Sequence, residues 1–359
     1  MNLMGDPEPG WANVMGAGLI GGSVGLALRA AGWRVGVVDA DPATEQEAIN
    51  RGVADRVGLE AGAAVTVVAA PVGVIPELVV RALAETTGVV TDVGSAKAGI
   101  CAQIDDPRFI GGHPMAGSDQ DGIAGARPDL FTDAMWVLTP TESTSETAFS
   151  TVRGLIRVLG AESIALPAIT HDELVALVSH VPHLTSAALM NLADSTSVEH
   201  RALLRLAAGG FRDMTRISAG RPAIWPDICL ANRDAIVAGL DRLVATISHT
   251  RSLVANEDRA GLYGLLDSAR TARLNLPVGY EHVEKASQLA VPIPDRPGEI
   301  AAIATLAAEL DVNILDLEIS HSGEGHQGVM TLVVDAAKAE RLLGGLMARG
   351  YRPTLRELD

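Results

Sequence analysis

Apolar residues follow three different spacings along the chain. Between residues 12 and 166, short runs rich in Val and Ile alternate with Ala-rich stretches of helical period, a pattern typical of a doubly wound sheet. We therefore expect an α/β Rossmann domain with a mostly parallel sheet over residues 1–166. The apolar runs predict six strands, at residues 12–15, 34–38, 65–69, 89–92, 109–112 and 135–139.

The two remaining segments have different patterns. From residue 167 to residue 285, Leu and Ala recur at steps of three and four, which predicts an all-α helical domain. From residue 286 to residue 359, the pattern predicts strand, helix, strand, strand, helix and strand, with turn clusters at residues 294–298 and 322–325. The third segment is thus expected to be a small α+β module of βαββαβ order.

Composition and charge exclude several classes of function. The chain is 48% hydrophobic but only 3% aromatic, and its formal net charge is -16. Such an acidic protein repels phosphate backbones and anionic membrane surfaces, so we expect neither nucleic acid nor a membrane as a partner. The longest uncharged run, residues 61–76, is shorter than the roughly 20 residues of a membrane span. The N-terminus also lacks a secretory signal pattern, so we expect a cytoplasmic protein.

The two cysteines give no sign of a metal site or a disulfide. Cys101 and Cys229 are far apart in apolar sequence, and no histidine follows either of them at the spacing of a zinc site. We expect two reduced, buried cysteines and no metal.

A glycine-rich turn follows the first predicted strand and opens a helix, as a dinucleotide-binding site requires. The glycines allow a tight turn and a close approach of the backbone to a pyrophosphate, whose charge the helix N-terminus favours. Asp39 ends the second predicted strand, 18 residues past Gly21. A carboxylate there binds ribose hydroxyls and repels a 2′-phosphate, which favours NAD over NADP. The predicted cofactor-binding residues are Gly16, Gly18, Leu19, Ile20, Gly21 and Asp39.

Polar side chains follow two further strands of the predicted sheet. Ser95 comes after the strand at residues 89–92, and His113 and Ser118 come after the strand at residues 109–112. In open α/β sheets, ligands bind at the carboxyl ends of the strands, so these residues should face the nicotinamide. A histidine on a short, stiff loop beside Gly and Pro is suited to accept a proton.

The helical segment contains a second polar cluster. Ser179, His180 and His183 begin one predicted helix, and the run FRDMTR at residues 211–216 precedes Trp225. From the residues alone, this cluster is either a salt-bridged helix surface or an anion-binding site.

Five motifs occur in order along the chain: GAGLIGGS, DVGSAK, GGHPMAGS, SHVPH and GGFRDMTRIS, followed by Trp225. Together they resemble the prephenate and arogenate dehydrogenase family, the TyrA-type enzymes, over residues 12–280. The resemblance implies a Rossmann domain, a helical dimerisation domain with a cleft between them, and a homodimer. It further implies NAD-dependent oxidative decarboxylation of prephenate to 4-hydroxyphenylpyruvate, or of arogenate to tyrosine.

The resemblance also assigns roles to individual residues. It makes His113 the catalytic histidine, with Ser95 beside it near the substrate hydroxyl. It makes Arg216 the anchor of a substrate carboxylate and Asp213 a charge that organises the arginine loop. The other substrate contacts that it implies are Ser179, His183 and Ser118, and Asp119 stands where many relatives have a Glu-containing segment.

The expected chemistry at His113 is acceptance of a proton. Loss of hydride from the carbinol carbon leaves positive charge at the attached hydroxyl, which a neutral imidazole relieves. We expect activity to fall below a pKa near the usual histidine value of about 6.5.

The C-terminal segment resembles an ACT domain, a regulatory module of amino-acid biosynthetic enzymes. The resemblance rests on PDRPG at residues 294–298 and VNI at residues 312–314. It implies tyrosine as a feedback effector near Gly298 and Asn313. The alternative is a module that only pairs subunits.

Two rival functions fit the sequence less well. A β-hydroxyacid dehydrogenase needs a lysine in its helical part, and this chain has none between Lys97 and Lys285. A non-catalytic sensor of NAD and an amino acid stays possible, but it gives no reason for His113, His183 and Arg216 to occur together. Arogenate carries an ammonium where prephenate has a keto group, so a carboxylate at Asp119 or Asp121 would favour arogenate; we prefer prephenate.

Overall fold

The computed structural model describes residues 8–118, 120–197, 206–275, 286–294, 296–321 and 327–358. The chain forms two compact units, which are treated separately below. The first comprises Met1–Ala188 and Ile217–Ile247, and the second comprises Leu189–Arg216 and Ser248–Asp359. These units divide the helical segment, and the predicted domain bounds at residues 166 and 285 stay predictions.

The first unit contains, within its described residues, an eight-stranded sheet of order β3-β2-β1-β4-β5-β6-β7-β8. Neighbouring strands are parallel except for β6 and β7. All six predicted strands are present, and the expectation of a mostly parallel sheet is confirmed. The strands are β1 Trp11–Met15, β2 Arg34–Val38, β3 Arg56–Val57, β4 Val65–Val68, β5 Val89–Asp92, β6 Phe109–Pro114, β7 Met135–Thr139 and β8 Glu162–Ala165.

The sequence pattern missed β3 and β8. Strand β3 has only two residues, and β8 pairs with β7 alone at the end of the sheet. Ile164 in β8 is exposed, so neither short edge strand produces a run of buried apolar residues.

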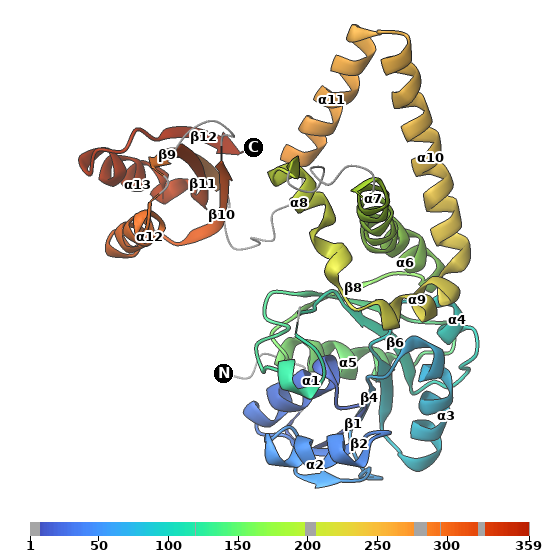
Figure 1. The fold of residues 1–359 in the computed structure, drawn as a ribbon. Coiled ribbons are helices and arrows are strands. Elements are labelled where there is room, and N and C mark those ends of the chain that lie inside the picture. Colours follow the sequence, from blue (N-terminus) through green and yellow to red (C-terminus); the bar gives the residue numbers. More distant parts are fainter. Residues whose placement is uncertain are drawn as a thin grey trace. The chain divides into compact units, whose positions relative to one another are not determined.

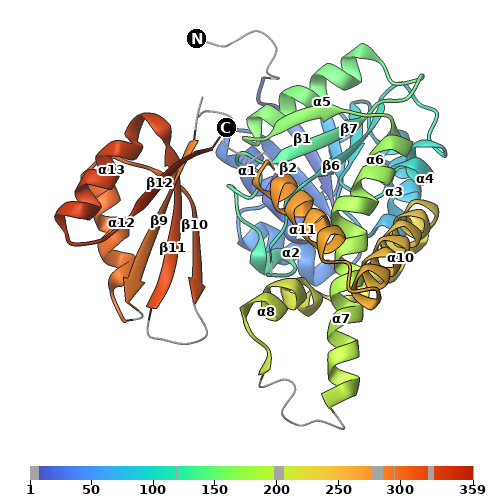
Figure 2. The same ribbon diagram turned by 90° about the horizontal axis from the view of Figure 1, so that it is seen from above.

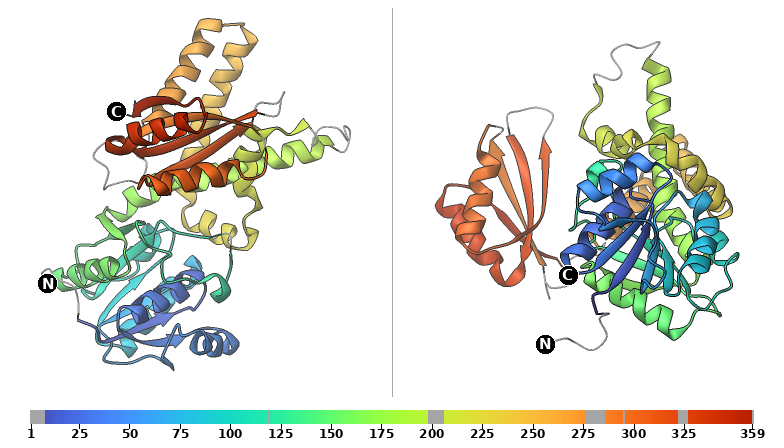
Figure 3. Two further views of the ribbon diagram at one scale, coloured as in Figure 1. Left: turned by 90° about the vertical axis from the view of Figure 1, so that its left-hand side faces the viewer. Right: turned by 90° about the horizontal axis from the view of Figure 1, so that it is seen from below.

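Helices cover both faces of this sheet (Figure 3). Successive strand residues point to opposite faces, so Val14 packs in the core that contains α1 and α5, while Met15 packs in the core that contains α3 and α4. Val67 and Val68 divide in the same way. The helices are α1 Leu19–Ala30, α2 Pro42–Asn50, α3 Ile75–Glu85, α4 Ala98–Cys101 and α5 Glu146–Val158, with single turns at Val72–Val74 and Ile123–Gly125.

The segment after residue 167 contains helices and no strand in its described residues up to Leu274, as predicted (Figure 1). A π-helical turn, Ala176–His180, separates α6 from α7. Pro182 lies in the first turn of α7 and has no N–H to continue the helical ladder, which explains the local irregularity. The elements are α6 Ala168–Val175, α7 Val181–Ser197, α8 Gly209–Thr215, α9 Trp225–Ala231, α10 Arg233–Ala255 and α11 Arg259–Leu274, with 3-10 turns at Arg216–Ala219 and Pro222–Ile224.

The C-terminal module has the predicted element order. Its four strands form an antiparallel sheet of order β10-β11-β9-β12, and α12 and α13 lie on one face of it (Figure 2). Assignment of the module as an ACT domain stays a prediction, and the predicted turn cluster at 322–325 lies outside the described residues. The elements are β9 Ala286–Pro294, α12 Glu299–Glu309, β10 Ile314–His321, β11 Gln327–Asp335, α13 Ala336–Ala348 and β12 Thr354–Leu358.

Among the described residues, no helix combines the length and the hydropathy that a membrane span requires.

Candidate active site

The glycine turn after β1 adopts the geometry that its sequence predicts. Gly16 has a φ of 97°, and a Cβ atom at this residue would lie 2.2 Å from the carbonyl oxygen of Ala69. A Cβ atom at Gly21 would lie 1.9 Å from the carbonyl oxygen of Gly16. Gly18 instead faces open space and caps α1 without any side-chain hydrogen bond. The N-terminus of α1 is therefore accessible to an anion.

Asp39 lies beside this turn, just past the end of β2. One of its carboxylate oxygens accepts a hydrogen bond from the backbone N–H of Ala17 at 2.7 Å, and the other accepts from that of Asp41 at 3.0 Å. Gly16, Gly18 and Asp39 line a cavity of about 490 Å³ whose other walls are mostly apolar. These residues fit the adenosine half of a dinucleotide, with the pyrophosphate toward α1.

The other two predicted cofactor residues and one unpredicted residue complete this region. Leu19 and Ile20 begin α1, and their half-buried side chains pack against the core; their role in cofactor binding stays a prediction. Arg81, which the sequence did not single out, lines the same cavity from α3, and its Nε atom donates to Glu85 at 2.8 Å. Its guanidinium is thus engaged by a carboxylate.

A second cavity, of about 280 Å³, brings together three of the predicted site residues. Ser95 comes from the loop after β5, His113 from the end of β6, and Ser179 from the π-helical turn. His180 and Trp225 complete its polar and aromatic lining. The sheet and the helical segment of the first unit thus supply one site together.

The remaining predicted substrate contacts do not line this cavity. The ring of His183 stacks on that of Trp225, with 3.6 Å between ring centroids and 12° between planes. Ser118 is exposed, and its hydroxyl accepts from the backbone N–H of Gln120. Asp213 and Arg216 belong to the second unit and are exposed there, and Asp119 lies outside the described residues.

A buried ion pair holds the end of β6, where His113 lies. Lys97 and Asp92 are fully buried and paired with each other. The Nζ atom of Lys97 also donates to the carbonyl oxygen of Gly112 at 3.0 Å, and the N–H of Gly112 donates to Asp92 at 3.2 Å. A buried charge that loses its partner is strongly destabilising, so this pair fixes the backbone immediately before His113.

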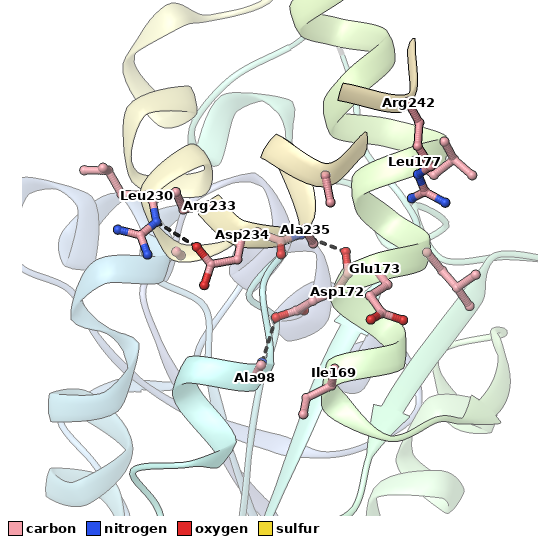
Figure 4. Close-up of a pocket in the computed structure, with 14 residues that line it drawn as sticks. Ala98, Ile169, Asp172, Glu173, Leu177, Leu230, Arg233, Asp234, Ala235 and Arg242 are labelled. Atoms are coloured by element: carbon pink, nitrogen blue, oxygen red, sulfur yellow. Dashed lines mark hydrogen bonds and ion pairs between the residues drawn. The ribbon is translucent and has the colours of Figure 1, made fainter. Parts of the chain in front are cut away.

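His171 and Asp172, which no sequence motif marks, are both buried directly behind His113. The Nδ1 atom of His113 lies 2.9 Å from the Nε2 atom of His171, whose Nδ1 atom lies 2.7 Å from Asp172. The Asp172 carboxylate also accepts from the backbone N–H group of Lys97 at 2.7 Å. It accepts from that of Ala98 at 2.8 Å as well (Figure 4). These contacts join α6 to the loop between β5 and α4.

Asn232, between α9 and α10, extends this buried network. Its side-chain amide donates to the backbone carbonyl oxygen of Asp172 at 2.8 Å and lies 3.2 Å from the Nδ1 atom of His180. No signal in the sequence distinguishes Asn232, His171 or Asp172 from ordinary helix residues, because their partners are distant along the chain.

Comparison with known proteins identifies the family of this chain. Sequence models of prephenate dehydrogenase match the chain in two stretches: the nucleotide-binding domain at residues 24–165 and the dimerization domain at residues 167–268. The chain belongs to the prephenate dehydrogenase family.

Individual relatives support this membership. The prephenate dehydrogenase of Bacillus subtilis (strain 168) is 32% identical over 333 residues, which cover 88% of this chain and 90% of the relative. The crystal structure of Synechocystis arogenate dehydrogenase matches with a TM-score of 0.66 and 29% identity, over 73% of this chain and 98% of that one. The prephenate dehydrogenase of A. aeolicus, solved with hydroxyphenyl propionate and NAD+, matches with a TM-score of 0.71 and 24% identity, over 76% and 99% of the two chains, and shows the shared fold.

The described part of this family member contains no metal-binding cluster. No three His, Cys, Asp or Glu side chains lie together there in a way that could hold a metal ion. Cys101 is buried and Cys229 is half-buried, and neither forms a disulfide.

Burial changes the titration of the histidines in this family member. Burial lowers the pKa of His113 well below the usual 6.5, with smaller contributions from Lys97, His171 and His180. Burial lowers the pKa of His180 to about 4, although the Asp172 carboxylate opposes the change. Neutral His113 therefore persists below the usual histidine pKa, and the pH at which activity falls stays a prediction.

The free energy of unfolding should fall as the pH drops below about 6.5. The unfolded chain then binds protons that buried His180 does not bind until the pH reaches about 4, so the unfolded state gains stability across this window. We expect the protein to be less stable at pH 5 than at pH 7 by about 2 kcal/mol from His180 alone. Urea denaturation at the two pH values measures this difference. In the His180→Asn variant the difference should shrink by that amount; an unchanged difference would exclude His180 as its source.

Proposed function

We propose that this chain is an NAD-dependent prephenate dehydrogenase, which converts prephenate to 4-hydroxyphenylpyruvate and carbon dioxide. The observation that carries the proposal is the cavity in which the imidazole of His113 lies with Ser95 and Ser179. When bound, NAD supplies the hydride acceptor for this reaction. Gly16, Gly18 and Asp39 are the residues that would hold it.

His113 acts on the substrate hydroxyl. Its lowered pKa keeps the imidazole neutral at physiological pH, so its free ring nitrogen accepts a hydrogen bond from the hydroxyl as positive charge develops there. The proton returns to the oxygen when carbon dioxide leaves and the ring becomes aromatic. Ser95 orients the same hydroxyl from the opposite loop.

Carboxylate recognition is assigned to the arginine loop. Prephenate carries two carboxylates, and a protein of net charge -16 needs a local positive group to bind it. Arg216 supplies the guanidinium, Asp213 organises the loop, and His183 and Ser118 make further contacts. These roles rest on the family motifs at those residues.

We propose prephenate rather than arogenate as the substrate, and the reason lies in the acidic loop after His113. A free carboxylate there would attract the ammonium of arogenate. Asp121 is not free, since its Oδ2 atom lies 2.5 Å from the Nε atom of Arg221. Arogenate oxidation, giving tyrosine directly, is the alternative, with Asp119 as the residue that would favour it.

The first test is an assay of NADH formation with prephenate and with arogenate, each with NAD and NADP. We expect turnover with prephenate and NAD to exceed the other three combinations.

Because positioned acid–base groups contribute about 10²–10⁴-fold, the His113→Asn variant should lose that factor in kcat while it still binds NAD. Wild-type turnover in this variant would remove His113 from the reaction, and a sensor without catalysis would form no NADH at all.

For Arg216, we expect the Arg216→Ala variant to raise the KM for prephenate about 10–100-fold, since a charge-assisted hydrogen bond contributes about 1.5–3 kcal/mol. NAD affinity should stay the same. Steady-state kinetics and NAD fluorescence titration measure both quantities. Arg251→Ala, which replaces another exposed arginine of the helical segment, is the matched control. If Arg216→Ala weakened the binding of prephenate and of NAD equally, Arg216 would have a structural role.

A homodimer formed through the helical segment is part of the proposal. Ile169, Leu177 and Leu230 border an open cavity of about 770 Å³ (Figure 4), and Leu230 is 74% exposed. Val178 is exposed nearby in sequence. So many exposed large apolar side chains are typical of a subunit interface, and the matched dimerization model covers this segment.

Light scattering should give a mass of about twice 37.3 kDa. A charge at the interface should separate the subunits, so Leu230→Glu is expected to lower the mass to that of one chain. Val80→Glu, on α3 outside the segment, should leave it unchanged. A monomeric wild-type protein would contradict the proposal.

Tyrosine is proposed as a feedback effector of the C-terminal module, on the basis of its βαββαβ order and the motifs around Gly298 and Asn313. Gly298 precedes α12 with a φ of 96°, whereas Asn313 follows that helix. The 11-residue helix is about 16 Å long, so one tyrosine does not bridge both residues within a single module.

Tyrosine titration of the full chain tests the effector role. We expect inhibition in the wild type and weaker inhibition in Asn313→Ala, because the exposed Asn313 side chain is lost without disturbing the core. Asn256→Ala, another exposed asparagine, should respond as the wild type does. Absence of inhibition in every form would leave the module with the role of pairing subunits only.

A further inference from the structure

Three side chains form a continuous hydrogen-bonded chain that ends at the cavity. His113 lines the cavity, and its Nδ1 atom contacts the Nε2 atom of His171 at 2.9 Å. The Nδ1 atom of His171 contacts the Asp172 carboxylate at 2.7 Å. His171 is fully buried and Asp172 is 4% exposed, so solvent does not replace either partner.

The Asp172 carboxylate fixes the direction of its own hydrogen bond with His171. A carboxylate only accepts, and here it already accepts from the backbone N–H groups of Lys97 and Ala98. The Nδ1 atom of His171 must therefore carry the proton that it shares with Asp172. We take His171 as neutral: its lone pair is then on Nε2, which accepts from His113.

It follows that the Nδ1 atom of His113 carries a proton and its Nε2 atom carries the lone pair. Since His113 lines the cavity, this lone pair is the one available to a hydroxyl group there. The other tautomer would present an N–H to the hydroxyl and could not accept its proton.

We infer that His171 is a positioning residue for the reaction: backed by Asp172, it holds His113 in the tautomer that accepts the substrate proton. The inference rests on the proposed role of His113. As His113 gains the proton, its Nδ1–H bond to His171 strengthens, and the resulting positive charge is shared toward the Asp172 carboxylate. No second proton transfer is required.

The other charged and titratable groups around His113 do not offer this function. Lys97, in the loop after β5, is paired with Asp92 and donates to Gly112, so it provides no acceptor. His180, from the π-helical turn, has its Nδ1 atom beside the amide of Asn232. Among the described hydrogen bonds of His113, the one to His171 is the contact that selects a tautomer.

A purely structural role for His171 is the rival explanation, since its ring also makes an edge contact with that of His113, with 5.1 Å between centroids. Two substitutions separate the roles. His171→Leu fills most of the space but removes the acceptor. His171→Gln can place an amide oxygen near the former Nε2 position and so keeps an acceptor without an imidazole.

The first experiment needs no substrate. In protein labelled with ¹⁵N-histidine, long-range ¹H–¹⁵N spectra distinguish protonated from unprotonated ring nitrogens, and the His113 signals are assigned by their loss in His113→Asn. We expect a protonated Nδ1 and an unprotonated Nε2 in the wild type and in His171→Gln, and a mixture of tautomers in His171→Leu. A protonated Nε2 in the wild type, or an unchanged tautomer in His171→Leu, would overturn the inference.

The second experiment uses steady-state kinetics of the same variants with prephenate and NAD. We expect His171→Leu to lower kcat about 10–100-fold, as removal of groups that orient a catalytic or metal-bound histidine does elsewhere, with little change in either KM. His171→Gln should recover most of the loss. A purely structural role would instead raise KM along with the loss of kcat, and the glutamine would not rescue the rate.

The two experiments also separate this inference from the proposed function. If the wild type oxidises neither prephenate nor arogenate, the proposed function is wrong, while the tautomer of His113 is still decided by the spectra. If the enzyme is active and the spectra show the opposite tautomer, the role of His171 alone is wrong.

Discussion

The candidate active site depends on the hydrogen bonds that the buried Asp172 carboxylate accepts. It accepts two backbone N–H groups from the loop after β5 and one from the ring of His171. A buried carboxylate with fewer donors would cost several kcal/mol, so this geometry fixes α6 against the sheet of the first unit. The π-helical turn that follows α6 then carries Ser179 and His180 into the cavity that His113 lines.

The loop after β5 also connects α6 to strand β6. Lys97 donates its backbone N–H to Asp172 and its ammonium to Asp92 and the carbonyl oxygen of Gly112. Its side chain thus fixes the end of β6 while its backbone fixes α6. The proposed proton acceptor is therefore held from two sides by one residue. Rigid placement of this kind is what acid–base chemistry requires, because small displacements of a catalytic group lower the rate steeply.

Sequence patterns predicted the fold better than the site. The six predicted strands were found because buried parallel strands are continuous runs of Val and Ile, whereas β3 and β8 are too short or too exposed to form such runs. Motifs also led to Ser95, His113 and Ser179, which line one cavity. His171, Asp172 and Asn232 were missed because their importance comes from partners about 50 to 75 residues away, which no local spacing reveals. Burial likewise decided the low pKa of His113, which composition did not indicate.

The role of His113 is tested most directly by a crystal structure of the enzyme with NAD and 4-hydroxyphenylpyruvate. Acceptance of the hydroxyl proton requires the phenolic oxygen to lie within about 3.2 Å of the Nε2 atom of His113. We expect this distance, with Ser95 close to the same oxygen. A phenolic oxygen more than about 4 Å from His113, held by other side chains, would contradict the assignment of His113 as the proton acceptor.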